Sequence, residues 1–154
     1  MDVGTLQLAG GERPHISKKG DRFLLQLIGH GDQERIGLFM PDDKVATWKE
    51  ISAVMEKIYP NTISQCVLNM TCCWGIHGIK ITDHLTPAAS FFGLLGPARA
   101  ILFTEGYKLN TKIYKKLFAG VHINQIIREV NNEFGKDILF GITAKGYREL
   151  AAAK

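Results

Sequence analysis

Short apolar runs alternate with longer segments of helical periodicity, and this alternation limits the possible folds more than any other feature of the chain. The first run, residues 23–28, is apolar almost throughout and is closed by a glycine, as is typical of a strand covered on both faces. The other runs that predict strands are 35–40, 65–71, 98–105 and 137–142. We therefore expect a single α/β domain over residues 1–154, with a mostly parallel central sheet of about five strands and helices on both faces.

Four segments between these runs are expected to be helices, three from the apolar spacing of amphipathic helices and the second from its N-terminal signal. They are residues 44–58, 87–95, 111–118 and about 122–134. The expected N-caps are Asp42 or Asp43 for the first, the Thr86-Pro87 pair for the second and Asn110 for the third. A glycine follows each of the last two segments, where it can adopt the left-handed conformation that commonly ends a helix.

The composition excludes several classes of protein. The chain has 154 residues, of which 45% are hydrophobic, which is enough for one core. The net charge of +4 is spread along the chain, so we expect no nucleic-acid partner. No apolar run reaches the ~18 residues of a membrane span, and we find no secretory signal. The three cysteines form an odd number, which argues against a disulfide framework and predicts a reducing compartment, the cytoplasm.

Two of the predicted strands end in residues that can carry chemistry. The run at 23–28 leads into Gly-His-Gly-Asp, with the imidazole at His30, and the run at 65–71 leads into Cys72 and Cys73. Chemistry in parallel sheets takes place beyond the carboxyl ends of the strands, so we expect these residues to meet at one edge. An imidazole can generate or stabilise a thiolate nucleophile. The glycine that follows His30 would leave the Gly31 amide free to bind a developing oxyanion.

The order of these blocks resembles the caspase-like cysteine peptidases, in particular the bacterial CHAT domains and the metacaspases. The histidine block of that superfamily corresponds here to "LLQLIGHGD", and the cysteine block corresponds to "VLNMTCCWG". The sequence "FFGLLGPARAILFTEGYKLN" then takes the place of a helix, a Gly-Ala-Arg-like turn and an apolar strand. The resemblance covers about residues 22–145. It implies a caspase-like three-layer sandwich and a cysteine endopeptidase that cleaves protein or peptide substrates without a metal or organic cofactor.

The resemblance also implies roles for individual residues. His30 would be the general base and acid of a His/Cys dyad, and Gly31 would contribute its amide to the oxyanion hole. Two cysteines can be the nucleophile: Cys72 fits a Cys-x-x-Gly spacing to Gly75, and Cys73 fits the shorter Cys-x-Gly spacing. We favour Cys72, which follows a small residue, and the other cysteine is then a packing residue.

Other polar residues near these motifs have less specific interpretations. Asp32 and Asp83 are candidates for orienting a substrate or His30, whereas Arg99 is expected to bond carboxyl or backbone groups near the third strand. A metal site formed by the two adjacent cysteines and His77 is not expected, because adjacent cysteines are poor ligands for one tetrahedral ion.

The chain departs from the family pattern at its N-terminus and at Trp74. Family members have two strands and a helix before the histidine strand, and 22 residues cannot hold them. We therefore expect a reduced sheet, or a sheet edge that is covered by a second copy in a homodimer or by a partner chain. Trp74 is unusually large for the loop beside the nucleophile. These departures leave two alternatives open: a non-catalytic, self-associating interaction or scaffold module, and one part of a split enzyme.

Overall fold

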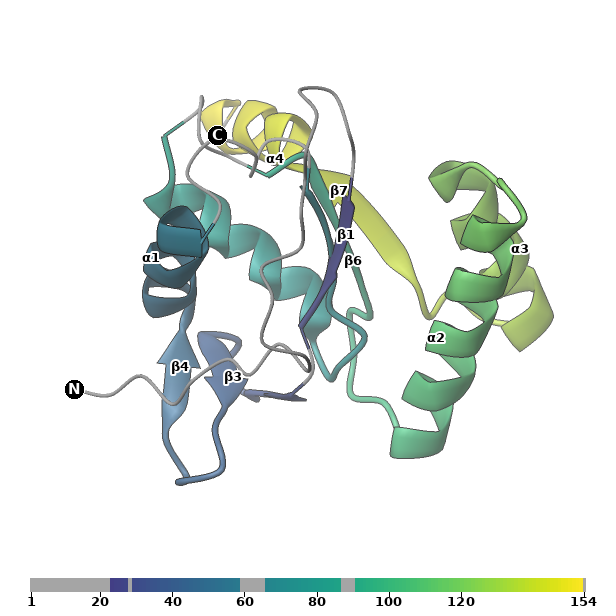
Figure 1. Cartoon of the computed structure of the whole chain (residues 1–154), viewed down its shortest axis with the longest axis horizontal. Coiled ribbons are helices and arrows are strands. Elements are labelled where there is room, and N and C mark those ends of the chain that lie inside the picture. Colours follow the sequence, from purple (N-terminus) through teal and green to yellow (C-terminus); the bar gives the residue numbers. More distant parts are fainter. Residues whose placement is uncertain (1–22, 28, 59–65, 87–90, 154) are drawn as a thin grey trace.

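A four-stranded sheet forms the centre of the protein (Figure 1). The computed structural model describes residues 23–27, 29–58, 66–86 and 91–153. Within these residues the strand order is β1-β5-β6-β7, and the strands are β1 (Phe23–Gln26), β5 (Cys66–Asn69), β6 (Gly93–Gly96) and β7 (Phe140–Thr143). The first three are parallel and β7 is antiparallel to β6. The α/β class is confirmed, but the sheet is mixed and its described part has fewer strands than the expected number of about five.

A second, three-stranded antiparallel sheet follows β1 directly in the sequence. Its strands are β2 (His30–Gly31), β3 (Gly37–Phe39) and β4 (Val45–Thr47), in that order. The apolar run at 35–40 predicted the middle strand, whereas the two outer strands were not predicted. Because β2 follows β1 after a few residues, this small sheet lies next to the carboxyl end of β1.

The expectation that Asp42 or Asp43 caps a helix is wrong, because both residues lie in the tight turn between β3 and β4. The Met40 N–H donates to the Lys44 carbonyl at 2.8 Å, which closes the turn, and Asp43 has a left-handed backbone with φ of 59°. Aspartate tolerates this conformation better than most residues, so the same residue type that caps helices also serves hairpins.

Helix α1 (Trp48–Ile58) begins after this hairpin. Its first turn is closed by Thr47 and Glu50: the Glu50 N–H donates to the Thr47 hydroxyl oxygen at 3.3 Å, and the Thr47 N–H donates to the Glu50 carboxylate at 2.8 Å. This reciprocal pair is a capping box. The expected helix over 44–58 starts too early, because Val45–Thr47 forms β4, but the apolar spacing from Trp48 through Ile51 to Met55 is confirmed, since all three are buried.

The predictions of a helix at 87–95 and a strand at 98–105 are both wrong, because the strand lies in the first segment and a helix begins in the second. Residues 87–90 lie outside the described part of the chain, but Gly93–Gly96 forms the strand β6. Leu94 and Leu95 point to opposite faces of the sheet and enter two different cores, which is what a central strand requires. The apolar run at 98–105 instead forms a loop and the first turn of helix α2 (Phe103–Phe118), so Asn110 lies inside this helix and does not cap it.

Glycine ends the two helices where the sequence predicted it. Gly120 follows α2 with φ of 77°, and Gly135 follows α3 (Ile123–Phe134) with φ of 64°. Both backbones are left-handed, a conformation that glycine adopts without steric cost. Two further helices complete the described chain: the 3-10 helix η2 (Gly75–His84) follows Trp74, and helix α4 (Ala144–Ala152) follows β7.

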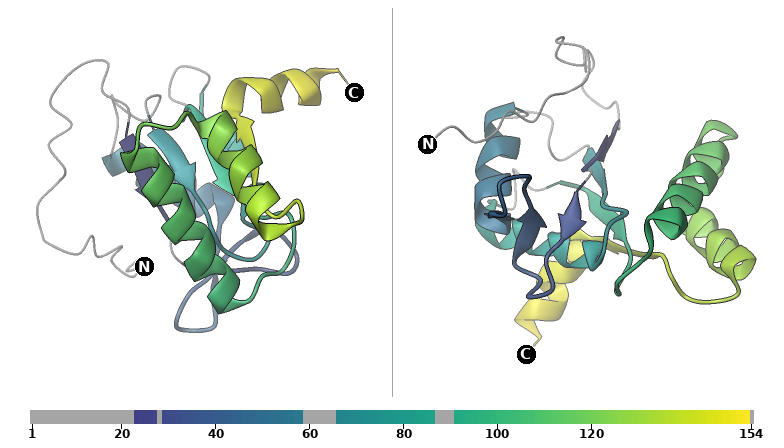
Figure 2. Two further views of the ribbon diagram at one scale, coloured as in Figure 1. Left: turned by 90° about the vertical axis from the view of Figure 1, so that its right-hand side faces the viewer. Right: turned by 90° about the horizontal axis from the view of Figure 1, so that it is seen from below.

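The helices cover both faces of the central sheet and form a layer on each side (Figures 1 and 2). Helices α1, η2 and α4 pack on one face, around a core that includes Leu68, Ile81 and Leu94. Helices α2 and α3 pack on the other face, around Leu95, Ile113 and Val130. Among the described residues, no helix is long and apolar enough to cross a membrane.

Candidate active site

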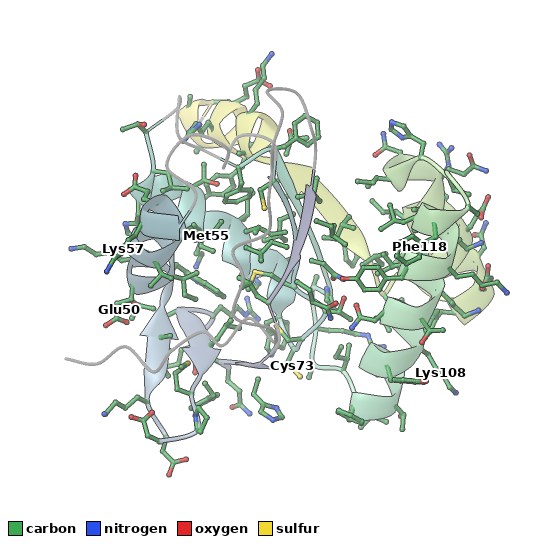
Figure 3. The ribbon with its side chains drawn as sticks, viewed as in Figure 1. Glu50, Met55, Lys57, Cys73, Lys108 and Phe118 are labelled. Atoms are coloured by element: carbon green, nitrogen blue, oxygen red, sulfur yellow. The ribbon has the colours of Figure 1, made fainter. Side chains whose placement is uncertain are left out.

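The candidate site lies where β1 and β5 end. These strands are parallel neighbours, with Gln26 opposite Asn69 at their carboxyl ends, which confirms the expected neighbour relation. The chain leaving β1 enters β2, which carries His30, and the chain leaving β5 reaches Cys72 and Cys73 within a few residues. Figure 3 shows Cys73 at this end of the central sheet.

Gly31 packs directly on the backbone of Cys73. A Cβ atom added at Gly31 would lie 1.5 Å from the Cys73 carbonyl oxygen and 2.6 Å from its carbonyl carbon, so no side chain fits. Two segments that are more than forty residues apart are therefore in backbone contact. The neighbouring His30 is exposed at the end of the small sheet, where it is paired with Phe39 in β3.

The two adjacent cysteines have different environments. Cys72 is 5% exposed and belongs to the core under α1 and η2. Burial, and to a smaller extent the neighbouring Cys73, raises the pKa of the Cys72 thiol to about 12. Cys73 is only partly buried. Because the thiolate is the nucleophilic form, the burial of Cys72 argues for Cys73 as the reactive residue. Cys66, in β5, is fully buried, and burial raises its pKa to about 12 as well.

The sulfur of Cys73 is held by the loop that joins β6 to α2. The Ile101 N–H donates to Sγ at 3.3 Å, and the thiol donates to the Ile101 carbonyl at 3.4 Å. Ile101 thus binds the sulfur through both of its backbone groups, a contact that the sequence did not predict. The two residues are too distant in the sequence for periodicity to relate them, and the segment around Ile101 was expected to be a strand.

Asp32 stabilises the turn after β2. It is 6% exposed, its carboxylate accepts the Ile36 N–H at 3.3 Å, and its own N–H donates to the Gly37 carbonyl at 3.2 Å. Its carbonyl accepts the Arg35 N–H at 3.0 Å. The carboxylate is thus bound within its own turn, and this geometry accounts for a buried acid without any contact to a substrate.

Trp74 and Arg35 form a stacked pair beside Cys73 that the sequence did not predict. The Arg35 guanidinium lies 4.3 Å from the centre of the Trp74 ring, a cation–π contact. Both residues have left-handed backbones, with φ of 61° at Arg35 and 58° at Trp74. The ring of His77 is tilted by 44° against the same tryptophan ring, with 6.4 Å between the ring centres. Partial burial lowers the pKa of His77, and the positive charges of Arg35 and Lys80 lower it further.

The side chains of the remaining polar candidates bond groups other than His30 and the cysteines. Arg99 donates to the Ala100 carbonyl and to the Glu105 carboxylate, as expected from its position near an apolar segment. Asp83 accepts a hydrogen bond from the Tyr147 hydroxyl at 3.1 Å. Among the described residues, no group of three or more His, Cys, Asp and Glu side chains is arranged to hold a metal ion.

Comparisons with known proteins add no relative to this picture. No protein-family model matches the sequence, no curated protein matches it significantly and no solved structure matches it significantly. The resemblance to caspase-like peptidases therefore stays a prediction from the motifs, and the function has to be argued from the geometry of the site.

Proposed function

We propose that this protein is a cysteine endopeptidase of the caspase-like kind, in which Cys73 is the nucleophile and His30 is the general base. The observation that carries the proposal is the backbone contact between Gly31 and Cys73, which brings the histidine segment against the cysteine segment at the carboxyl ends of two parallel strands. We prefer Cys73 to Cys72 because Cys72 is buried in the core, where a thiolate is disfavoured.

The proposed reaction needs only residues of this chain and water. His30 takes the proton of the Cys73 thiol, and the thiolate attacks the carbonyl carbon of the scissile peptide bond. Backbone amides, among them that of Gly31, would stabilise the resulting oxyanion. The C–N bond breaks as the leaving amine takes the proton from His30. Water then hydrolyses the thioester, which releases the carboxylic acid and restores the thiol.

We expect the substitutions Cys73→Ala and His30→Ala each to lower cleavage of a fluorogenic peptide library at least about a thousandfold, because the dyad acts as a unit. His84→Gln, at an exposed histidine in η2, is the control and should cleave like the natural protein. A peptide electrophile should label the natural protein and fail to label Cys73→Ala. Labelling that survives in Cys73→Ala but is lost in Cys72→Ala would transfer the nucleophile to Cys72, and labelling that survives in both would contradict the proposal.

A non-catalytic interaction module is the second candidate, and exposed aromatic residues on α2 favour it. Phe103 and Phe118 are 89% and 88% exposed, and surface aromatic residues of this kind are enriched in protein interfaces. If the protein sediments as a stable dimer and its Cys73 does not react with the electrophile, the interaction module is favoured over the peptidase. A monomer that is labelled at Cys73 would favour the peptidase.

A further inference from the structure

Residues 97–102, the 97–102 loop, lie alongside the turn that carries Cys73. The Trp74 N–H donates to the Arg99 carbonyl and the Ile76 N–H donates to the Pro97 carbonyl, both at 3.0 Å. A Cβ atom on Gly96, just before the loop, would lie 2.7 Å from the backbone of Gly75 and Ile76. The loop and the turn are therefore joined by backbone hydrogen bonds and packed closely together. A movement of the loop would change the surroundings of the sulfur.

Ile101 in this loop contacts the Cys73 sulfur through both of its backbone groups. Its N–H donates to Sγ and its carbonyl accepts the thiol proton. The carbonyl bond exists only while the sulfur is protonated, and a thiolate in this position would face a carbonyl oxygen. Both contacts place the backbone of Ile101 against the sulfur, and this keeps an attacking reagent from approaching from that side.

The carboxylate of Glu105, in the first turn of α2, binds the loop on both sides of Ile101. One oxygen accepts the Leu102 N–H at 3.0 Å, and the other accepts the Arg99 guanidinium at 2.9 Å and the Lys136 ammonium at 2.7 Å. The Glu105 side chain is 18% exposed. Lys136, Arg99 and the Leu102 N–H lower the pKa of Glu105 to about 2, so these bonds persist across the neutral range.

We infer that Glu105 and Arg99 are positioning residues that hold Ile101 on the sulfur of Cys73 and keep this thiol in a guarded state. The inference rests on the proposed role of Cys73 as nucleophile, but it concerns the access to the sulfur and the chemistry of the thiol itself. Loosening the 97–102 loop would free the sulfur from Ile101. The sulfur could then attack carbon electrophiles.

The test is the rate at which iodoacetamide alkylates Cys73 in the full chain, with the modified residue located by tandem mass spectrometry. Thiolate sulfur displaces iodide, so a carbon–sulfur bond forms and iodide leaves. We expect Glu105→Gln and Arg99→Gln to accelerate this alkylation by roughly three- to tenfold, the range of losing one ion pair with its helix-start contact. Arg99→Lys, which keeps the positive charge, should restore most of the protection.

Glu133→Gln is the matched control. Like Glu105, Glu133 accepts two cations, here Lys112 and Lys116, and these ion pairs lower its pKa to about 2. It joins α2 to α3 and makes no bond to the 97–102 loop. This variant should lose comparable stability in urea while alkylation of Cys73 stays at the rate of the natural protein.

Equal alkylation rates in the natural protein, Glu105→Gln and Arg99→Gln would overturn the inference, as would an equal acceleration in Glu133→Gln. The result is independent of peptide cleavage. If alkylation responds as expected and no peptide is cleaved, the guarding loop stands and the peptidase proposal fails. If peptides are cleaved and the alkylation rate does not change in the variants, the peptidase proposal stands and the guarding loop fails.

Discussion

At Gly31 the hydrogen side chain allows two distant backbones to touch. We predict that Gly31→Ala destabilises the protein by about 1–3 kcal/mol, the usual cost of overpacking, because the new Cβ meets the backbone of Cys73, which cannot rotate away. Urea unfolding measures the loss. Gly29→Ala is the control, since its Cβ would have no neighbour nearer than 3.8 Å. A Gly31→Ala protein as stable as Gly29→Ala would show that the two segments are not in contact.

The sequence predicts the approach of His30 and the cysteines but not the rest of the site. Both motifs follow neighbouring parallel strands, and the carboxyl ends of such strands converge in any α/β sheet. Which cysteine is accessible depends on where the chain turns after β5, and the motif spacing left both possibilities open. The stacking of Arg35 on Trp74 depends on two left-handed backbones in separate loops, for which no sequence pattern exists.

The start of helix α1 depends on the hydroxyl of Thr47. We expect Thr47→Ala to lower the free energy of unfolding by about 1 kcal/mol, because the Glu50 N–H then loses its acceptor and the capping box is broken. Thr47→Ser keeps the hydroxyl oxygen and should lower the free energy of unfolding by only about a few tenths of a kcal/mol. Urea midpoints of the two variants measure the difference, and equal losses in both would mean that the hydroxyl does not stabilise the helix start.

The elements that were predicted correctly have strong end signals, whereas the wrongly predicted ones depend on tertiary packing. Helix α3 has a complete apolar face and a left-handed glycine at its end, so its bounds follow from the sequence. The sequence Gly-Leu-Leu-Gly of β6 has neither helical nor alternating periodicity. It becomes a strand because its two leucines fill opposite cores, a fact that only the complete fold supplies.

On the scale of the whole molecule, the candidate site is assembled from both layers. The small sheet, whose Leu38 shares a core with α1, carries His30, and the turn before β3 carries Arg35. Ile101 packs against the other core, and Glu105 lies in the first turn of α2. The cysteine turn lies between them at the end of β5, so changes in either layer can reach the Cys73 sulfur. This explains why the site cannot be read from one continuous segment of the chain.

The ion pairs around α2 and α3 make the stability of the folded protein depend on pH in the acidic range. The pKa values of Glu105 and Glu133 are lowered from 4.5 to about 2 in the folded protein, chiefly by the hydrogen-bonded cations Lys136 and Lys112. The unfolded chain therefore binds more protons than the folded one between these values. The stabilisation is complete above pH 4.5 and is lost as the pH falls toward about 2.

We expect the urea midpoint to fall as the pH is lowered through this range, and the fall to be smaller in the Glu105→Gln, Glu133→Gln double variant, which has no carboxylates to protonate at these positions. Because both carboxylates are partly exposed, added salt should weaken the effect by screening the ion pairs. Other acids also titrate in this range, so the difference between the natural protein and the double variant is the decisive quantity. If both proteins lose stability in parallel, the two glutamates do not link the helices to the loop and to each other in the way that the structure indicates.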